Sequence, residues 1–366
     1  MAAGGTGGHL FPGIAIAREI AKIDKSAEIL FIVTRKYQDK MILMKEGFKY
    51  YALPTKGLVG KKAIEKLVFP IFLMLAVLQF LLIVTLKKPR AVVGTGGYAS
   101  FVPLFVGILF RIPTLISEQD SYPGFTTRML SRYVTQVHIA HRKAGLFLKA
   151  KKLYVTGNPI RNKIFDGTRA EAIDYFELSK TKKTVLILGG SHGARSINKV
   201  FSEIFKEHSF PGKQFILQTG DTDFNWVKES LQGAKAEVRI LPFIEKMNLA
   251  YAAADLVFSR AGALATAEIT ATGIPSVLIP YPFAASGHQE ENARRLERIG
   301  ASVVLLDKNL STDAVFDLIN SFFSDTGRLE KMHNAAISSC KRNAAKKIAT
   351  HVLSISRSGG SCVQKC

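Results

Sequence analysis

The sequence is poor in cysteine and in acidic residues. Its three cysteines, Cys340, Cys362 and Cys366, all lie toward the C-terminal end of the 366 residues. This odd number, clustered at one end, argues against a disulfide framework and against a zinc site. No His-Glu-x-x-His pattern occurs either, so we expect no metal. A reducing cytoplasm is the simplest setting for such a chain.

Negative charge is scarce. The chain has 29 Asp and Glu against 50 Lys and Arg, a formal net charge of +21. This imbalance favours an anionic partner, such as nucleic acid, an anionic membrane surface or a phosphorylated ligand. A basic surface that only keeps the protein soluble is the alternative. We expect no secretory signal, because a glycine-rich loop occupies the position of its apolar region.

One long apolar run stands out, from Leu67 to Leu86, which reads LVFPIFLMLAVLQFLLIVTL. As a helix it would be about 30 Å long, enough to cross a bilayer. Basic residues flank it on both sides, so they do not orient it across a membrane. They suit a helix that lies on an anionic leaflet with its apolar face inserted. A buried core helix and a true membrane span are the alternatives.

Elsewhere, short apolar runs alternate with helical stretches, which predicts parallel sheets covered on both faces. The alternation restarts near residue 184, and 366 residues are enough for two cores. We predict an α/β protein of two doubly wound, Rossmann-like domains facing a cleft, residues 1–160 and 161–339, with a C-terminal helix at about 340–356 that packs back on the first. The expected strands are 29–33, 91–93, 114–117, 136–140, 153–156, 184–188, 214–218, 237–241, 256–259, 276–280 and 302–306.

Three glycine-rich loops, at residues 4–8, 94–97 and 189–193, each follow an expected strand position and precede a helix. Glycine allows positive φ and close approach of a ligand, and amides at a helix N-terminus can bind phosphate oxygens. None is a Walker loop, because no Gly-Lys-Ser/Thr follows. The middle loop also fits the dinucleotide pattern G-x-G-x-x-A with Glu118 downstream, but the other two argue against a plain dehydrogenase. Tight turns without a ligand are the alternative.

Three further features could carry chemistry. His9 follows the first loop and could take a proton from a hydroxyl near neutral pH, although a histidine there is by itself more often a structural cap. The stretch SRAGALATAE opens a helix whose amides could bind phosphate, and Glu268 within it could bind a ribose diol. An acid that complements the helix dipole is the alternative for Glu268. The polar run from His288 to Asn292 could bind a sugar or cap its helix.

Together, the motifs GGTGGH, GTGGY, SEQDSYPG, TGNPIR, LGGSHGARSIN, LPFI, SRAGALATAE and HQEENA occur in the order typical of one family. The chain resembles the MurG family of bacterial glycosyltransferases, which have the glycosyltransferase-B fold. The matches run from residue 4 to about residue 300, so they cover most of the chain.

The resemblance implies a reaction and a location. N-acetylglucosamine is transferred from UDP-N-acetylglucosamine to the C4 hydroxyl of undecaprenyl-diphospho-N-acetylmuramoyl-pentapeptide, with inversion at the anomeric carbon. Lipid I becomes lipid II in peptidoglycan synthesis. The enzyme would be a peripheral protein on the cytoplasmic face of the bacterial membrane, with no cofactor and no nucleic-acid partner.

The resemblance also assigns site residues. His9 would be the general base. The donor would contact Ser191, Ile244, Ala263, Leu264, Ala265, Thr266, Glu268, Gln289 and Arg161, with Ile244 meeting the uracil through its backbone and Glu268 the ribose. The acceptor diphosphate would face Thr6, Gly7, Gly8, Gly96, Gly97, Tyr98 and Asp120.

The chain departs from the family pattern in three places. Only Met1-Ala2-Ala3 precede the first glycine loop, where relatives carry an apolar strand, so the start is misplaced or the sheet lacks its central strand. The sequence has Ser117 and Asp120 where the family reads His-Glu-Gln-Asn. The Leu67–Leu86 helix is also more apolar than expected for a peripheral enzyme. Three rival functions are a UDP-sugar transferase to another lipid such as diacylglycerol, a UDP-sugar epimerase, and an inactive or membrane-spanning scaffold.

Overall fold

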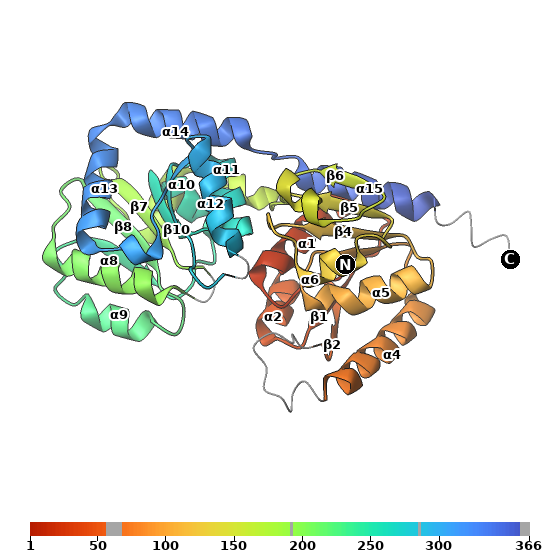
Figure 1. Cartoon of the computed structure of the whole chain (residues 1–366). Helices are drawn as coiled ribbons and strands as arrows, with labels where there is room; N and C mark the ends of the chain where they lie inside the picture. Colours follow the sequence, from red (N-terminus) through yellow and green to blue (C-terminus); the bar gives the residue numbers. More distant parts are fainter. Residues whose placement is uncertain (56–67, 191–192, 285–286, 359–366) are drawn as a thin grey trace. The chain divides into compact units, whose positions relative to one another are not determined.

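The computed structural model describes residues 1–55, 68–190, 193–284 and 287–358 (Figure 1). These residues form two compact units. The first comprises Met1–Arg161 and the segment that begins at Lys341, and the second is Asn162–Cys340. Each unit contains a parallel sheet with helices on its faces, which confirms the predicted α/β fold class.

The first unit contains six parallel strands. They are β1 (Leu30–Thr34), β2 (Lys49–Leu53), β3 (Val92–Gly94), β4 (Thr114–Glu118), β5 (Gln136–Ile139) and β6 (Leu153–Val155). Strand β2 was not among the predicted strands; it reads KYYAL and alternates between exposed and partly buried positions before the buried Leu53. Its outward positions carry Lys49 and Tyr51 rather than apolar residues, and β2 pairs with β1 alone.

The three residues before the first glycine loop lie in the middle of this sheet. Ala2 forms parallel bridges to Ile32 of β1 and to Gly94 of β3. Its N–H donates to the carbonyl of Val93 at 2.6 Å, and its carbonyl accepts from the N–H of Thr95 at 3.1 Å. Ala2 therefore fills the central place in the sheet between β1 and β3. The first glycine loop begins just beyond it, at the carboxyl ends of these strands.

Helices cover both faces of the first sheet. They are α1 (Gly7–Ile23), α2 (Tyr37–Lys45), α4 (Phe69–Lys87), α5 (Phe101–Leu109), α6 (Phe125–Leu130) and α15 (Ala344–Ser358), with the 3₁₀ turns Tyr98–Ser100 and Arg142–Phe147. The C-terminal α15 packs against α1, where Ile16 and Ile20 share a core with Ile348 and Val352. The opposite face carries α4 and α5.

The apolar run forms α4, and it has two different sides. Ala76, Phe80, Ile83 and Val84 are buried against the sheet and α5. Among the described residues, α4 is the one helix long and apolar enough to cross a membrane. The alternative of a buried core helix therefore holds for one face of α4 only. The other face exposes six apolar side chains, each 47–70% exposed: Ile71, Met74, Leu75, Leu78, Leu82 and Leu86.

The second unit contains a six-stranded parallel sheet in the order β12-β11-β10-β7-β8-β9. The strands are β7 (Lys183–Leu188), β8 (Lys213–Gln218), β9 (Val238–Leu241), β10 (Leu256–Arg260), β11 (Ser276–Ile279) and β12 (Ser302–Val304). The helices are α7 (Arg169–Phe176), α8 (Arg195–Glu207), α9 (Phe224–Ser230), α10 (Met247–Ala253), α11 (Ala263–Thr272), α12 (His288–Arg298), α13 (Thr312–Ser324) and α14 (Thr326–Ser339), with the 3₁₀ turns Asn162–Phe165 and Asp307–Asn309.

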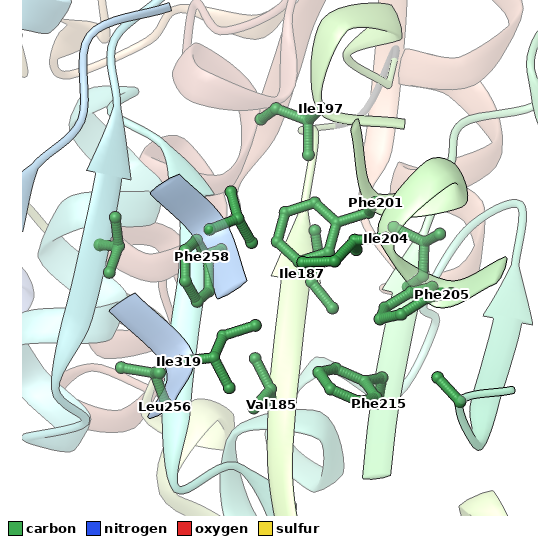
Figure 2. Close-up of a cluster of buried hydrophobic side chains, with 14 of the residues drawn as sticks. Val185, Ile187, Ile197, Phe201, Ile204, Phe205, Phe215, Leu256, Phe258 and Ile319 are labelled. Carbon is green, nitrogen blue, oxygen red and sulfur yellow. The ribbon is translucent and has the colours of Figure 1, made fainter. Parts of the chain in front are cut away.

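A phenylalanine-rich core fixes one face of this second sheet (Figure 2). Phe201 and Phe205 of α8 pack onto Phe215 of β8 and Phe258 of β10. All four side chains are fully buried. Helix α8 is thereby fixed on the sheet, and its N-terminus lies at the carboxyl edge of β7.

A ring cluster joins α15 to the first sheet and gives a test of this packing. His138 stacks on Tyr154, and both rings contact His351 of α15. Burial, and to a lesser extent the neighbouring His351, lowers the pKa of His138 from 6.5 to about 3. The unfolded chain therefore binds a proton below pH 6.5 that the folded chain does not bind until about pH 3, so stability is lost as the pH falls through this window.

We expect the wild-type protein to lose about 2 kcal/mol more unfolding free energy between pH 7 and pH 5 than His138→Phe, at about 1.4 kcal/mol per pH unit. The phenyl ring keeps the stacking and removes the titrating group. Urea unfolding at both pH values measures the difference. An equal pH dependence in the two proteins would show that His138 does not set it.

Candidate functional site

The second sheet has a topological switch point between β7 and β10. From β7 the chain continues to β8 and β9 on one side, then returns to β10 on the other side of β7. Loops beyond the carboxyl ends of such adjacent strands are the usual ligand sites of doubly wound sheets. Here they are the glycine loop that starts at Gly189 and the turn at Gly262 that opens α11.

The glycine loop after β7 needs glycine for steric reasons. A Cβ on Gly193 would lie 2.1 Å from the carbonyl oxygen of Thr219, and its φ is +75°. A Cβ on Gly189 would lie 2.5 Å from the backbone nitrogen of Ala194. Ser191, assigned to the donor by resemblance, lies outside the described residues.

The helices that follow these two loops have no side-chain caps. Ala194 and Gly262 are the N-cap residues of α8 and α11, and neither caps its helix with a side-chain hydrogen bond. The hydroxyl of Thr266 bonds instead to the carbonyls of Gly262 and Ala263, both at 3.0 Å. An uncapped helix N-terminus at a switch point suits an anionic group such as a diphosphate.

Glu268 lies beyond the first turn of α11 and is 5% exposed. The hydroxyl of Tyr251 donates to its carboxylate at 3.3 Å. This position does not fit an ordinary first-turn acid that complements the helix dipole. A buried, oriented carboxylate can accept hydrogen bonds from a diol, and the ribose contact stays a prediction.

Ile244 and Gln289 flank the same edge of the sheet. Ile244 is 4% exposed, and its N–H donates to Oε1 of Gln218 at 3.2 Å. The side-chain oxygen of Gln289 accepts from the N–H of Tyr281 at 3.0 Å, which leaves its amide nitrogen to donate.

Arg260, the last residue of β10, was not among the predicted site residues. Its buried guanidinium donates to Asp307 at 2.6 Å, to Ser196 at 2.7 Å and to the carbonyl of Ile279 at 3.2 Å. Arg260 thereby ties β11, the N-terminus of α8 and the turn at Asp307 together. An arginine at the end of an apolar strand was the signal that could have identified it.

In the first unit, the first two glycine loops lie against each other around His9. Nδ1 of His9 lies 3.0 Å from the carbonyl oxygen of Thr95 and 3.4 Å from Oε1 of Gln119. Both oxygens can only accept, so Nδ1 carries the proton and the neutral ring has its lone pair on Nε2. Gly96 and Gly97 have φ of +92° and +68°, and a Cβ on either would lie within 3.0 Å of the ring.

The first loop is held by Asp39, which was not among the predicted site residues. Its carboxylate is 4% exposed and accepts from the N–H of Gly5 and from the hydroxyl of Thr34, both at 2.8 Å. The ammonium of Lys36 donates to the carbonyl of Gly5 at 2.5 Å. The amide of Gly5 is therefore already in use, and those of Gly7 and Gly8, at the start of α1, are better placed to meet an anion.

Glu118 organises the turn after β4. It is 3% exposed, and its carboxylate oxygens accept from the N–H groups of Asp120 and Gly124, both at 3.1 Å. Burial raises the pKa of Glu118, the charge of Asp120 adds to this, and the Thr127 hydroxyl opposes it. Because Glu118 is bound to its own loop, the structure does not support the dinucleotide-binding alternative, which needs it for a ribose.

Tyr98 and Arg161 are two further predicted site residues. The ring of Tyr98 lies 3.3 Å from where a Cβ of Gly5 would be, so it joins the same cluster of loops. Arg161 belongs to the first unit, where its guanidinium lies 4.0 Å from the ring centroid of Phe11. Within the part of the chain that the structure describes, no group of His, Cys, Asp and Glu could hold a metal ion.

Comparison with known proteins decides the family. Residues 1–139 match the glycosyltransferase family 28 N-terminal domain and residues 184–363 the C-terminal domain. A protein of Thermodesulfovibrio yellowstonii named UDP-N-acetylglucosamine–N-acetylmuramyl-(pentapeptide) pyrophosphoryl-undecaprenol N-acetylglucosamine transferase is 39% identical over 351 residues, 95% of this chain and 96% of the relative. The chain belongs to the MurG family.

A second relative and a solved structure support the same family. A MurG-family relative of the same name from Acetivibrio thermocellus is 38% identical over 95% of both chains. The crystal structure of Acinetobacter baumannii MurG matches with a TM-score of 0.74 and 26% identity, covering 97% of this chain and 98% of that one. A UDP-GlcNAc 2-epimerase from Neisseria meningitidis, with a TM-score of 0.66 and 14% identity, shares the fold alone.

Proposed function

We propose that this MurG-family protein transfers N-acetylglucosamine from UDP-N-acetylglucosamine to the C4 hydroxyl of undecaprenyl-diphospho-N-acetylmuramoyl-pentapeptide, making lipid II from lipid I with inversion. The observation that carries the proposal is the 39% identity, over 95% of the chain, to a relative named for this transfer. The architecture supports it, because the second unit carries glycine-lined loops beyond a topological switch point.

The second unit would hold the donor. The uncapped start of α11 meets a phosphate through the amides around Ala265, while Thr266 shapes that turn. Glu268, oriented by Tyr251, accepts from the ribose hydroxyls. Gln289 donates to the sugar. The uracil meets the backbone of Ile244, and fixed backbone donors stabilise the charge that develops on departing UDP.

The first unit would hold the acceptor and the base. The amides of Gly7 and Gly8 and the loop from Gly96 to Tyr98 face the acceptor diphosphate. Nε2 of His9 takes the proton of the C4 hydroxyl as its oxygen attacks the anomeric carbon. The new bond forms on the face opposite the departing phosphate oxygen, which leaves with the bonding electron pair. The product has the inverted configuration.

The membrane contact would be made by α4. Its inner face is fixed on the sheet, and its outer face exposes a row of apolar side chains. Lys87 ends the helix and Lys88 and Arg90 follow it, where they suit anionic headgroups. A helix with one face packed on the sheet favours a peripheral association on the cytoplasmic leaflet over a span.

An acceptor panel tests the proposal. Purified protein receives radiolabelled UDP-N-acetylglucosamine with lipid I, with diacylglycerol or with no lipid, and products are separated by chromatography. We expect a labelled product only in the reaction that contains lipid I. Label on diacylglycerol would assign a different acceptor, and conversion of the nucleotide sugar without any lipid would indicate an epimerase.

Glu268→Gln tests the donor site. We expect it to weaken UDP binding by about 10-fold or more, because a charge-assisted hydrogen bond to a diol is worth about 1.5–3 kcal/mol. Isothermal titration with UDP measures the change. Tyr251→Phe should have a smaller effect in the same direction, and wild-type affinity in Glu268→Gln would remove the ribose assignment.

A further inference from the structure

Gln218, the last residue of β8, connects two loops of the second unit. It is 5% exposed. Its side-chain nitrogen donates to the carbonyl of Gly190 at 2.9 Å, and its side-chain oxygen accepts from the N–H of Ile244 at 3.2 Å. A carbonyl can only accept and an N–H can only donate, so these partners fix the orientation of the amide.

The Gly190 end of this bridge stabilises the turn of the glycine loop. The carbonyl of Gly190 also accepts from the N–H of Gly193 at 3.0 Å, so both of its lone pairs are used. Gly190 has a φ of +86°, and a Cβ there would meet nothing within 4 Å. No packing contact therefore fixes the position of Gly190, and the two hydrogen bonds to its carbonyl do so instead.

The Ile244 end fixes the segment after β9. The side chain of Ile244 is buried in the core beneath the sheet edge, and its N–H is bound by Gln218. One buried side chain thus spans the loops that follow β7 and β9, the two segments expected to meet the diphosphate and the base of the donor.

We propose that Gln218 is a positioning residue that sets the spacing between the diphosphate loop and the base-binding backbone for a uridine diphosphate ligand. The proposal rests on the donor site described under Proposed function. Gln218 does not touch the reacting atoms. It acts through Gly190 and Ile244.

The same strand offers a matched control. Gln214, also on β8 and 3% exposed, donates to the carbonyl of Ser179 and to the hydroxyl of Thr184, both at 3.0 Å. It therefore makes the same kind of buried bridge, four residues earlier on the strand and away from the proposed site. Gln214→Leu and Gln218→Leu remove equivalent groups from the same sheet.

The experiment measures binding of UDP and of uridine to the full-length wild type, Gln218→Leu, Gln218→Glu and Gln214→Leu, together with the Tm of each. We expect Gln218→Leu to weaken UDP binding by about 10- to 100-fold and Gln214→Leu by less than about 2-fold, with similar losses of Tm. Gln218→Glu keeps the acceptor for Ile244 but faces Gly190 with a carboxylate, so UDP should weaken more than uridine.

Three outcomes overturn the inference. Wild-type UDP affinity in Gln218→Leu would show that the bridge does not position the site. Equal weakening in Gln214→Leu and Gln218→Leu would show a general effect of stability. Absence of UDP binding in the wild type would defeat the donor site itself, whereas either of the first two results would leave the donor site standing.

Discussion

His9→Ala lowers the turnover number by about 10²- to 10⁴-fold, the usual contribution of a positioned general base. The reason is geometric: Nδ1 donates to the carbonyl of Thr95, so Nε2 carries the lone pair that accepts the proton. Steady-state kinetics with lipid I measures the loss. Binding of UDP should be unchanged, because the donor loops belong to the second unit.

His9→Asn is the matched variant. Its side-chain amide can still donate to the Thr95 carbonyl and support the loop, but it cannot act as a base near neutral pH. We expect it to lose as much turnover as His9→Ala. Turnover near the wild-type value in His9→Asn would show that His9 only shapes the loop.

Changing Leu75, Leu78 and Leu82 of α4 together to serine weakens binding to anionic vesicles by about 100-fold. These side chains are 47%, 55% and 59% exposed, so each can bury roughly another half of its surface in lipid. Burial of that surface contributes about 1 kcal/mol of binding free energy for each of the three side chains. Cosedimentation with vesicles measures the partitioning. The Tm and UDP binding should stay the same, because the buried face of α4 is untouched.

The triple isoleucine variant at the same three positions keeps the apolar surface and should bind vesicles like the wild type. If the serine variant binds equally well, the contact lies elsewhere. Carbonate washing of membranes adds a separate check, because it releases a peripheral protein and leaves a spanning one in place.

Local sequence signals predicted most of the strands. The parallel strands β7 and β10 contain the buried apolar runs VLIL and LVF, so composition alone marks them. Strand β2 was missed because its outward residues are polar or aromatic. The place of Ala2 depends on pairing with Ile32 and Gly94, residues far along the chain, and no local pattern reports such a bridge.

The candidate site was predictable where chemistry resides in a local motif. Glycine loops and the helix start at Ala263 are of this kind, because steric and helix-end effects act within a few residues. Asp39, Gln218 and Arg260 were missed because their importance comes from partners on other strands and loops. Such roles follow from the sheet register, which emerges only when the strand order is known.

We expect backbone groups beyond β7 and β10 to hold the nucleotide diphosphate. Amide hydrogen exchange of the full-length protein with and without UDP tests it most directly. We predict that UDP slows exchange at Gly193, around Ala265 and near Ile244, and leaves the amides of Gly7, Gly8 and Gly97 unchanged. Slower exchange confined to the glycine loops of the first unit would contradict this account.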